Sequence, residues 1–312
     1  MKQSLLDILR DPRDRQPLTL RIDSQRGDEI LTGELVAGDG TRYAITKGIP
    51  RFVPHDDYVE NFSFEWTKHR TTQLDSAHNS RESEERFAES LPYPLAELKG
   101  KLVLDVGCGM GRFSEIVLKY GGTVVGIDLS YAVDAAWTNM GQHAGANFVQ
   151  ANVFALPFAP ESFDLIYSLG VLHHTPDPRA AFDCLPMLLK PGGTLMTTFY
   201  AAYNKAYVAA SEFWRRVFRP VPRPILYKMA HVSIPFYYLS RLPKIGKLFS
   251  TFFPMSGHRR TEWRVLDTFD WWSPQYQFYY THPEVFRWYQ DHRLSNIVVK
   301  GPGISLAGTR SL

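Results

Sequence analysis

Cysteine is scarce in this chain of 312 residues, which contains only Cys108 and Cys184. Two thiols exclude a disulfide framework and a zinc site built from four thiolates, and they suit a reducing compartment such as the cytoplasm. Long hydrophobic runs are missing as well. The most apolar stretch, residues 225–239, is interrupted by lysine, histidine and proline, so the sequence predicts no membrane-spanning helix. The N-terminal apolar run is too short to predict a secretory signal.

A large excess of one charge is also absent, because 35 basic and 32 acidic residues leave a net charge of +3. This near balance gives no general argument for a nucleic-acid partner. Hydrophobic residues make up 44% and charged residues 21% of the chain, as in ordinary folded proteins. Residues 201–270 differ from the rest, since they contain 12 basic residues against 4 acidic ones.

Four regions differ in their sequence patterns. Residues 1–54 are short strand-like runs separated by turns, and they predict a small β-rich module. Residues 55–200 and 281–312 predict a core in which strands alternate with helices, whereas residues 201–280 are an α-rich aromatic and basic insertion. The alternation predicts an α/β fold of the Rossmann-like type, with helices on both faces of a mostly parallel, seven-stranded sheet. The expected strands are 101–106, 123–128, 147–150, 163–168, 194–200, 296–300 and 304–309.

Three glycines follow the first core strand directly, in the run Val103-Leu-Asp-Val-Gly-Cys-Gly-Met-Gly-Arg112. Glycine allows a tight turn and a close approach of the backbone to a ligand, because it has no Cβ atom. A helix follows the turn, and the free amides at its N-terminus favour a negatively charged group. The glycines alone are weak evidence, since a tight turn without any ligand has the same pattern.

Two aspartates strengthen the case for a ligand. Asp128 ends the second core strand, where a carboxylate can accept hydrogen bonds from both hydroxyls of a ribose. Asp105 lies near the end of the first strand, below the glycine turn. A dinucleotide-binding turn has the spacing G-x-G-x-x-G, whereas this chain has Asp-x-Gly-x-Gly-x-Gly. The combination therefore favours a nucleoside cofactor that is not a dinucleotide.

With these motifs in order, residues 58–200 and 281–312 resemble the class I S-adenosylmethionine (SAM)-dependent methyltransferases, most closely the ubiquinone/menaquinone-biosynthesis type. The resemblance implies SAM as the cofactor and methyl transfer as the activity. It also implies that Asp105 holds the methionine amino group and that Asp128 binds the ribose hydroxyls. Gly107 and Gly109 would pass beneath the methionine and the ribose.

Further cofactor contacts are implied by the same resemblance. Asn152 and Val153 match the stretch that borders the adenine. Relatives commonly have Asp at the position of Asn152, and the amide keeps an acceptor for the adenine amino group while it loses the charge. The expected cofactor-binding residues are Asp105, Gly107, Cys108, Gly109, Asp128, Leu129, Asn152, Val153, Leu169 and Trp66.

His173 and His174 are the catalytic candidates, because they follow the strand at 163–168, where the methyl group should face its acceptor. Methyl transfer from a sulfonium needs mainly alignment and exclusion of water, and a base only if the acceptor loses a proton. An imidazole can be that base. The alternative, which we favour for His174, is a cap of the turn at 175–178. Metal-dependent relatives have two Glu residues where this chain has Gly170 and His173, so no metal site is expected.

An aromatic group precedes the core, and it resembles the cap that closes over SAM in related enzymes. It consists of Phe62, Phe64 and Trp66, followed by Gln73 and Leu74. Packing against the sheet explains the same residues equally well. The next stretch, residues 80–90, is rich in Glu and Arg and predicts a solvent-exposed helix.

Residues 4–54 resemble the zinc-ribbon-like activator subunit of tRNA and release-factor methyltransferases, through pieces such as Gly48-Ile-Pro-Arg-Phe52. The two cysteine pairs of that subunit would fall at residues 11–14 and 37–40, and none of these residues is cysteine. A zinc site needs thiolates or imidazoles. We therefore expect a metal-free module that packs on, or positions, the core.

The insertion interleaves aromatic with basic side chains and contains no catalytic pattern. Our first interpretation is a lid over a small apolar or anionic acceptor. The second is peripheral membrane contact through residues 201–250, which would admit a lipid-like substrate. A nucleic-acid surface ranks last, because no RNA-binding pattern accompanies these residues. Packing on the core, with the charges in solvent, explains the segment as well.

The run that ends the insertion, residues 266–280, resembles the wall of a substrate pocket. Asp270, Trp272, Tyr276 and Tyr280 are the expected acceptor contacts, with structural packing as the alternative for tryptophan. The whole sequence thus predicts a cytoplasmic methyltransferase that methylates oxygen or activated carbon of a small organic acceptor, aromatic or quinone-like. Two alternatives stay open, namely a membrane-associated lipid or quinone methyltransferase and a non-catalytic SAM-binding scaffold. No sequence feature defines the oligomeric state.

Overall fold

The computed structural model describes residues 1–53, 69–242 and 245–311. The chain forms two compact units, which we describe separately. The first comprises Met1–Leu172, Asp177–Phe199 and His282–Leu312, and the second His173–Pro176 and Tyr200–Thr281. Within the described ranges, no helix combines the length and the apolarity that crossing a bilayer requires.

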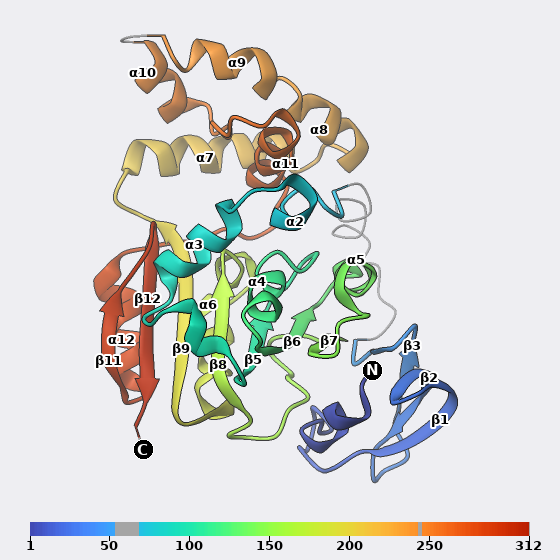
Figure 1. The fold of residues 1–312 in the computed structure, drawn as a ribbon. Helices are drawn as coiled ribbons and strands as arrows, with labels where there is room; N and C mark the ends of the chain where they lie inside the picture. Colours follow the sequence, from blue (N-terminus) through green and yellow to red (C-terminus); the bar gives the residue numbers. More distant parts are fainter. Residues whose placement is uncertain (54–68, 243–244, 312) are drawn as a thin grey trace. The chain divides into compact units, whose positions relative to one another are not determined.

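A seven-strand path with the order β11-β12-β9-β8-β5-β6-β7 forms the centre of the first unit (Figure 1). Strands β5 to β9 are parallel, whereas β12 pairs antiparallel with β9 and β11 antiparallel with β12. The strands are β5 (Leu102–Val106), β6 (Thr123–Asp128), β7 (Ala146–Gln150), β8 (Phe163–Leu169), β9 (Leu189–Ala201), β11 (Leu294–Val299) and β12 (Ile304–Arg310). The predicted mostly parallel Rossmann-like sheet is therefore confirmed.

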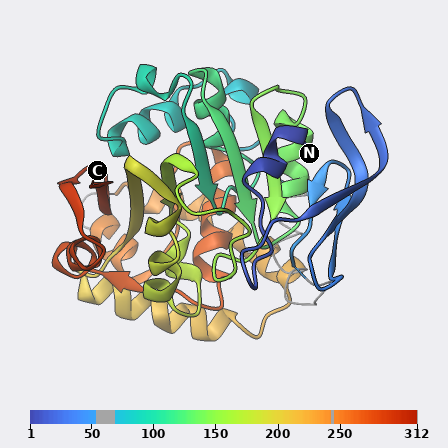
Figure 2. The same ribbon diagram turned by 90° about the horizontal axis from the view of Figure 1, so that it is seen from below.

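Helices cover both faces of this sheet, as Figure 2 shows from below. One face carries α3 (Glu82–Ser90), α4 (Ser114–Lys119) and α5 (Ala132–Met140), and the other carries α6 (Pro178–Asp183) and α12 (His282–Asp291). The central strands are apolar and buried on both sides, as parallel strands between two helical layers must be. Asp177 starts α6, because its side chain accepts a hydrogen bond from the Ala180 amide and proline follows it.

The strand order reverses beside β5, whose neighbours are β6 on one side and β8 on the other. In open α/β sheets, ligands bind beyond the carboxyl ends of the strands at such a reversal. The glycine turn that follows β5 lies at this position. The fold thus brings together the ends of β5, β6, β7 and β8, which come from distant parts of the sequence.

The N-terminal module is a four-stranded antiparallel sheet in the order β1-β2-β3-β4, preceded by the short 3-10 helix η1 (Gln3–Asp7). Its strands are β1 (Thr19–Arg26), β2 (Glu29–Val36), β3 (Arg42–Thr46) and β4 (Ile49–Pro50). Figures 1 and 2 both show it beside β7 and α5. Directly after β4, Arg51 forms a parallel bridge with Gln150, and the Phe52 amide donates to the Gln150 carbonyl at 2.9 Å. The module therefore packs on the edge of the core sheet within the first unit.

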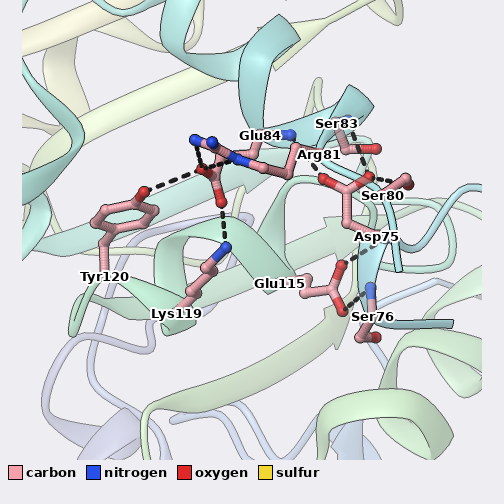
Figure 3. A network of polar contacts seen from close by, with 9 residues as sticks. All are labelled: Asp75, Ser76, Ser80, Arg81, Ser83, Glu84, Glu115, Lys119 and Tyr120. Carbon is pink, nitrogen blue, oxygen red and sulfur yellow. Dashed lines mark hydrogen bonds and ion pairs between the residues drawn. The ribbon is translucent and has the colours of Figure 1, made fainter. Parts of the chain in front are cut away.

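Two short helices, α2 (Asp75–His78) and α3, are joined to α4 by a polar network around the buried carboxylates of Asp75 and Glu84 (Figure 3). Glu84 is 2% exposed and accepts hydrogen bonds from Arg81, Lys119 and Tyr120. The bond from Lys119 is the main cause that lowers the pKa of Glu84. The Glu115 carboxylate accepts from the first amides of α2, and the Asp75 carboxylate accepts from those of α3.

This network corrects one sequence expectation. Residues 80–90 are helical but not simply solvent-exposed, since Ser83, Glu84, Phe87 and Ser90 form a buried face. The sequence argument took charged residues as a sign of exposure. The Glu84 carboxylate is nevertheless buried, because cations and a hydroxyl donate hydrogen bonds to it.

The second unit is mainly helical, as the sequence predicted for the insertion. It contains α7 (Lys205–Phe218), α8 (Arg223–Ala230), α9 (Ser233–Leu239), α10 (Ile245–Phe252) and α11 (Thr261–Trp272). A core of Phe218, Leu226, Tyr227, Val265, Phe269 and Trp272 holds α7, α8 and α11 together. The two-residue strand β10 (Tyr279–Tyr280) pairs in parallel with Tyr200 and Ala201, the last residues of β9.

Candidate cofactor and acceptor site

The glycine turn after β5 adopts a conformation that favours glycine. Gly107, Gly109 and Gly111 have φ angles of 79°, 54° and 92°, in the left-handed region where a Cβ atom is strained. A Cβ on Gly107 would also meet a Val171 methyl carbon at 2.4 Å. The amides of Gly107 and Cys108 both donate to the Ile127 carbonyl, at 2.8 and 2.9 Å. These bonds hold the turn against the end of β6.

Asp128 connects the end of β6 to that turn. Its Oδ2 atom accepts a hydrogen bond from the Gly109 amide at 3.1 Å, and its Oδ1 atom accepts from the amide and hydroxyl of Ser130 at 2.9 and 2.7 Å. The residue is half-buried, and burial raises its pKa. Each carboxylate oxygen can accept more than one hydrogen bond. The fixed carboxylate therefore fits a vicinal diol such as a ribose.

Asp105 is buried beneath the turn, as the sequence predicted. The Ser114 hydroxyl donates to its Oδ2 atom at 2.7 Å, and the buried hydroxyl of Tyr167 lies near the same carboxylate without a hydrogen bond to it. Burial raises the pKa of Asp105 to about 7. A buried carboxylate with so little compensation gains most from a cation. An ammonium group such as that of methionine therefore suits this position.

The loops after β6 and β7 lie side by side, because the Ala151 amide donates to the Asp128 carbonyl at 3.0 Å. Leu129, Asn152 and Val153 are half-buried on these loops. The Asn152 side-chain oxygen accepts from the Phe154 amide at 3.0 Å, so it also orders its own loop. A second lone pair of this oxygen is available for an adenine amino group.

Two other predicted cofactor residues lie on neighbouring segments. Leu169 ends β8 and is half-buried. Cys108 is buried, and burial raises the pKa of its thiol well above the usual value, so this side chain stays an uncharged thiol. Trp66, Phe62 and Phe64 lie outside the described residues. Leu74, from the same predicted cap, packs with Met110 and Ala135.

Sequence reasoning missed a chain of contacts from the N-terminal module to this site. The Arg51 guanidinium forms a bidentate ion pair with Asp134 and donates to the Gln150 side-chain oxygen at 2.9 Å. The Gln150 amide nitrogen donates in turn to the Leu129 carbonyl at 3.0 Å, directly after Asp128. The only sign of these contacts in the sequence was a single arginine within the apolar run 49–53, and nothing in the sequence identified its partners.

The two histidines belong to the second unit. His173 is fully buried, and its ring centroid lies 4.0 Å from that of Tyr200. The His174 Nδ1 atom lies 2.9 Å from the Tyr276 carbonyl oxygen, and a carbonyl can only accept, so Nδ1 carries the proton and Nε2 is the acceptor. Burial lowers the pKa of His174 to about 4. The hydrogen bond of His174 Nδ1 thus runs to Tyr276, and Asp177 caps the helix α6 that follows the turn at 175–178.

The predicted acceptor contacts differ in their surroundings. Trp272 is buried in the helical core, where it stacks on Phe218 and donates from Nε1 to the Pro254 carbonyl at 2.8 Å, so packing accounts for this side chain. Tyr276 and Tyr280 are half-buried. Asp270 also belongs to this unit and is half-buried.

A polar group near β10 was not predicted. The Tyr279 hydroxyl donates to the Ser211 hydroxyl at 2.8 Å, and the Gln277 amide nitrogen donates to the Tyr279 hydroxyl. Gln277 is 7% exposed, and its side-chain oxygen has no hydrogen-bond partner. Such a buried acceptor favours a ligand with a hydroxyl or N–H group. Only the fold brings α7 to these residues, so the sequence carried no signal for the group.

These features define a Rossmann-like fold of the class that binds a nucleoside cofactor. They are a parallel sheet with a glycine turn where its strand order reverses, Asp105 below that turn, and Asp128 at the end of the next strand. In the described part of the chain, no three or more His, Cys, Asp or Glu residues are grouped to hold a metal ion.

Comparison with known proteins identifies the family. A family profile described as a methyltransferase domain matches residues 104–197. A ubiquinone biosynthesis O-methyltransferase of Pseudomonas fluorescens is 31% identical over 170 residues, which is 54% of this chain and 73% of that protein. The chain belongs to the class I SAM-dependent methyltransferases, whose cofactor is S-adenosyl-L-methionine.

Other matches are shorter. A ubiquinone biosynthesis O-methyltransferase of Coxiella burnetii is 35% identical over 128 residues, or 40% of this chain and 55% of that protein. The chain thus spans about half the length of the first curated relatives that it matches. A solved SAM-dependent methyltransferase from Mesorhizobium loti is 29% identical, with a TM-score of 0.33, and the match covers 36% of this chain and 52% of that one.

Proposed function

We propose that this protein transfers a methyl group from SAM to an oxygen or activated carbon of a small organic acceptor, aromatic or quinone-like. The observation that carries the proposal is the carboxylate of Asp128, which accepts the Gly109 amide and the Ser130 groups and keeps lone pairs for a ribose. The named relatives are ubiquinone O-methyltransferases, which supports a hydroxylated ring as acceptor.

The candidate cofactor-binding residues of the first unit each have a role in this proposal. SAM, when bound, supplies an electrophilic methyl group. Asp105 would hold the ammonium of its methionine part, and the glycine turn would leave room for the sulfonium chain. Asp128 would bind the ribose hydroxyls, and Asn152 with Val153 would border the adenine. These contacts would align the methyl group, which is the protein's main task in such a displacement.

The second unit would bind the acceptor. The Gln277 side-chain oxygen would accept a hydrogen bond from a hydroxyl of the acceptor, and Tyr276 and Tyr280 would contact its ring. His174 is the candidate to accept an acceptor proton at Nε2. A pKa of about 4 makes it a weak base at neutral pH, which favours an orienting role through Tyr276 over proton abstraction.

The N-terminal module would act as a metal-free support of the core. The loops where the zinc-ribbon-like resemblance expects cysteine pairs contain Asp11, Arg13 and Asp39. Arg13 donates to both carboxylates, at 2.6 Å to Asp11 and 2.9 Å to Asp39, and Tyr43 donates to Asp11. The cation would join the two loops in place of a metal ion.

The replacement Asp128→Ala tests the proposal. We expect SAM affinity, measured by calorimetric titration, to fall at least about tenfold, since a hydrogen bond to a charged group contributes about 1.5–3 kcal/mol. The far-UV spectrum and melting temperature should stay close to those of the original protein. Asp7→Ala, at an exposed residue of η1, is the matched control. Undiminished SAM binding by Asp128→Ala, or no SAM binding by the original protein, would refute the proposal.

A further inference from the structure

We infer that helices α8 and α9 form a docking surface for an anionic lipid bilayer. The surface consists of six exposed apolar residues with two basic ones among them, which we call the α8–α9 face: Ile225, Lys228, Met229, Val232, Tyr238, Leu239, Arg241 and Leu242. The inference concerns the second unit alone.

The part of the α8–α9 face that lies on α8 follows helical spacing. Ile225, Lys228, Met229 and Val232 lie at positions i, i+3, i+4 and i+7, which places them on one side of α8 and the turn after it. The opposite side, with Leu226, Tyr227 and Ala230, is buried in the core of the unit. An ordinary surface helix is polar on its solvent side. Here the solvent side carries the exposed apolar residues Ile225, Met229 and Val232 around Lys228.

Further exposed apolar residues lie at the end of α9 and just after it, and α9 follows α8 after two residues (Figure 1). Tyr238, Leu239 and Leu242 are exposed by 68%, 42% and 46%, and Ile225 by 52%. Single exposed apolar residues are normal on a protein surface, whereas a series at helical spacing marks a surface that binds something apolar.

The charge of this part of the chain points to an anionic occupant. No acidic residue occurs between Glu212 and Glu262, although ten lysines and arginines do. Two of these, Lys228 and Arg241, are exposed members of the α8–α9 face. Apolar side chains beside lysine and arginine, without acids, fit the boundary between acyl chains and anionic headgroups. A protein partner whose interface carries both charges would not require that all acidic residues be absent between Glu212 and Glu262.

The docking surface does not depend on the activity, but what it implies for the acceptor rests on the proposed function. The second unit also holds the candidate acceptor residues Tyr276, Gln277 and Tyr280. A methyltransferase that docks on a bilayer through this unit would take an acceptor that is dissolved in the membrane. Under both proposals, the acceptor would be an apolar, ring-containing molecule with a hydroxyl group.

Flotation with vesicles tests the inference. We expect the full chain to float with phosphatidylcholine vesicles that contain phosphatidylglycerol, and to float much less with phosphatidylcholine alone. Each basic residue near an anionic surface strengthens binding about fivefold. The variant Lys228→Glu with Arg241→Glu should therefore bind at least about 25-fold more weakly. The variant Ile225→Ser with Met229→Ser and Leu239→Ser should bind at least about tenfold more weakly.

A matched control alters an exposed apolar and an exposed basic residue of the first unit. Val299→Ser with Lys300→Glu changes such a pair next to β11 and should float like the original protein. Melting curves of all variants show whether each is folded. SAM titration of each variant keeps the two ideas apart, because intact SAM binding without flotation would overturn the docking surface and leave the proposed function standing.

Three further outcomes would overturn the docking surface. One is equal flotation of the original protein and the two α8–α9 variants. Another is a dimer in sedimentation equilibrium without vesicles that the apolar variant dissociates, which would assign the face to a second copy of the chain. The third is binding of single-stranded RNA, but not of vesicles, that the charge variant abolishes.

Discussion

The guanidinium of Arg51 and the carboxylate of Asp134, 83 residues apart in the sequence, form a bidentate ion pair with N–O distances of 2.8 and 2.9 Å. Arg51 belongs to the N-terminal module, and Asp134 lies in the first turn of α5, behind the loop that begins with Asp128. The pair is largely shielded from water, since the two side chains are 14% and 30% exposed. The module therefore contacts the helix that follows the candidate ribose site.

We expect Arg51→Ala to weaken SAM binding about tenfold, because it frees both Asp134 and the Gln150 side chain that holds the Leu129 carbonyl. The free energy of unfolding should fall by about 1–3 kcal/mol. Arg51→Lys should recover little, since an ammonium cannot form the bidentate pair. Calorimetric titration and denaturant unfolding measure both effects.

Arg42→Ala is the control for this variant. Arg42 forms an exposed ion pair with Glu34 in the same module, and exposed pairs contribute less than about 1 kcal/mol. It should leave SAM affinity unchanged. An Arg51→Ala protein that binds SAM as tightly as the Arg42→Ala protein would show that the module does not support the cofactor loop.

Asp105 should make SAM binding depend on pH. Its pKa of about 7 in the free protein means that acid protonates it, whereas an ammonium ligand needs the charged form. Affinity should therefore decline as pH falls below about 7, by at most about tenfold per pH unit. An α-amino group loses its proton above about pH 8, so affinity should also decline there.

The variant Asp105→Asn should bind about ten- to hundredfold more weakly at neutral pH and lose the acid limb of this profile. Glu97→Gln, at an exposed residue of the first unit, should retain the full profile. An acid limb that persists in Asp105→Asn would mean that another group titrates.

Glu84 should make the free energy of unfolding depend on pH on the acidic side. Its folded-state pKa is lowered, so it stabilises the fold above the usual glutamate pKa of 4.5, and that contribution disappears as pH falls through the folded value. We expect Glu84→Gln to lower the free energy of unfolding by about 1–3 kcal/mol at neutral pH and by less below pH 4.

Urea unfolding at neutral and acidic pH, with Glu89→Gln on the exposed side of the same helix as control, measures this difference. A loss that is constant across the pH range would mean that packing, rather than the charge, is responsible.

His174 is tested by a pair of variants. Asn places its amide nitrogen near the position of the His Nδ1 atom, so His174→Asn should keep the bond to the Tyr276 carbonyl and retain activity within about threefold. His174→Ala should lose about tenfold or more, because a buried carbonyl is left unpaired.

The measurement is the initial rate of S-adenosylhomocysteine formation with a hydroxylated aromatic acceptor. A fall of about 100-fold or more in kcat for His174→Asn, with unchanged KM, would instead assign proton abstraction to Nε2.

Arg13 should link the loops of Asp11 and Asp39 without a metal ion. We expect a chelator to leave the melting temperature unchanged, and Arg13→Ala to lower it, because both Asp11 and Asp39 lose their shared cation. Asp11 is buried, and its pKa is lowered mainly by Arg13, so the loss of Arg13 leaves a buried charge poorly paired. Melting that shifts with the chelator and recovers with zinc would contradict this account.

Local sequence determined the core of this protein. The glycine turn and the two strands that carry Asp105 and Asp128 near their ends are encoded within a few residues, because strand, turn and helix each have their own short-range pattern. Asn152 and Val153, after β7, were predicted from the resemblance to methyltransferases, and the fold places their loop beside the end of β6. The fold class and the likeness to methyltransferases follow from these segments.

Only the tertiary structure decided which distant residues meet. The ion pair of Arg51 with Asp134, the burial of Glu84 and the group of Ser211, Gln277 and Tyr279 join segments that no periodic pattern relates. Hydrogen bonds and ion pairs are short-range and depend on orientation, so they appear only when the backbone has placed both partners. The exposed apolar side of α8 likewise emerged only once its opposite side was seen in the core.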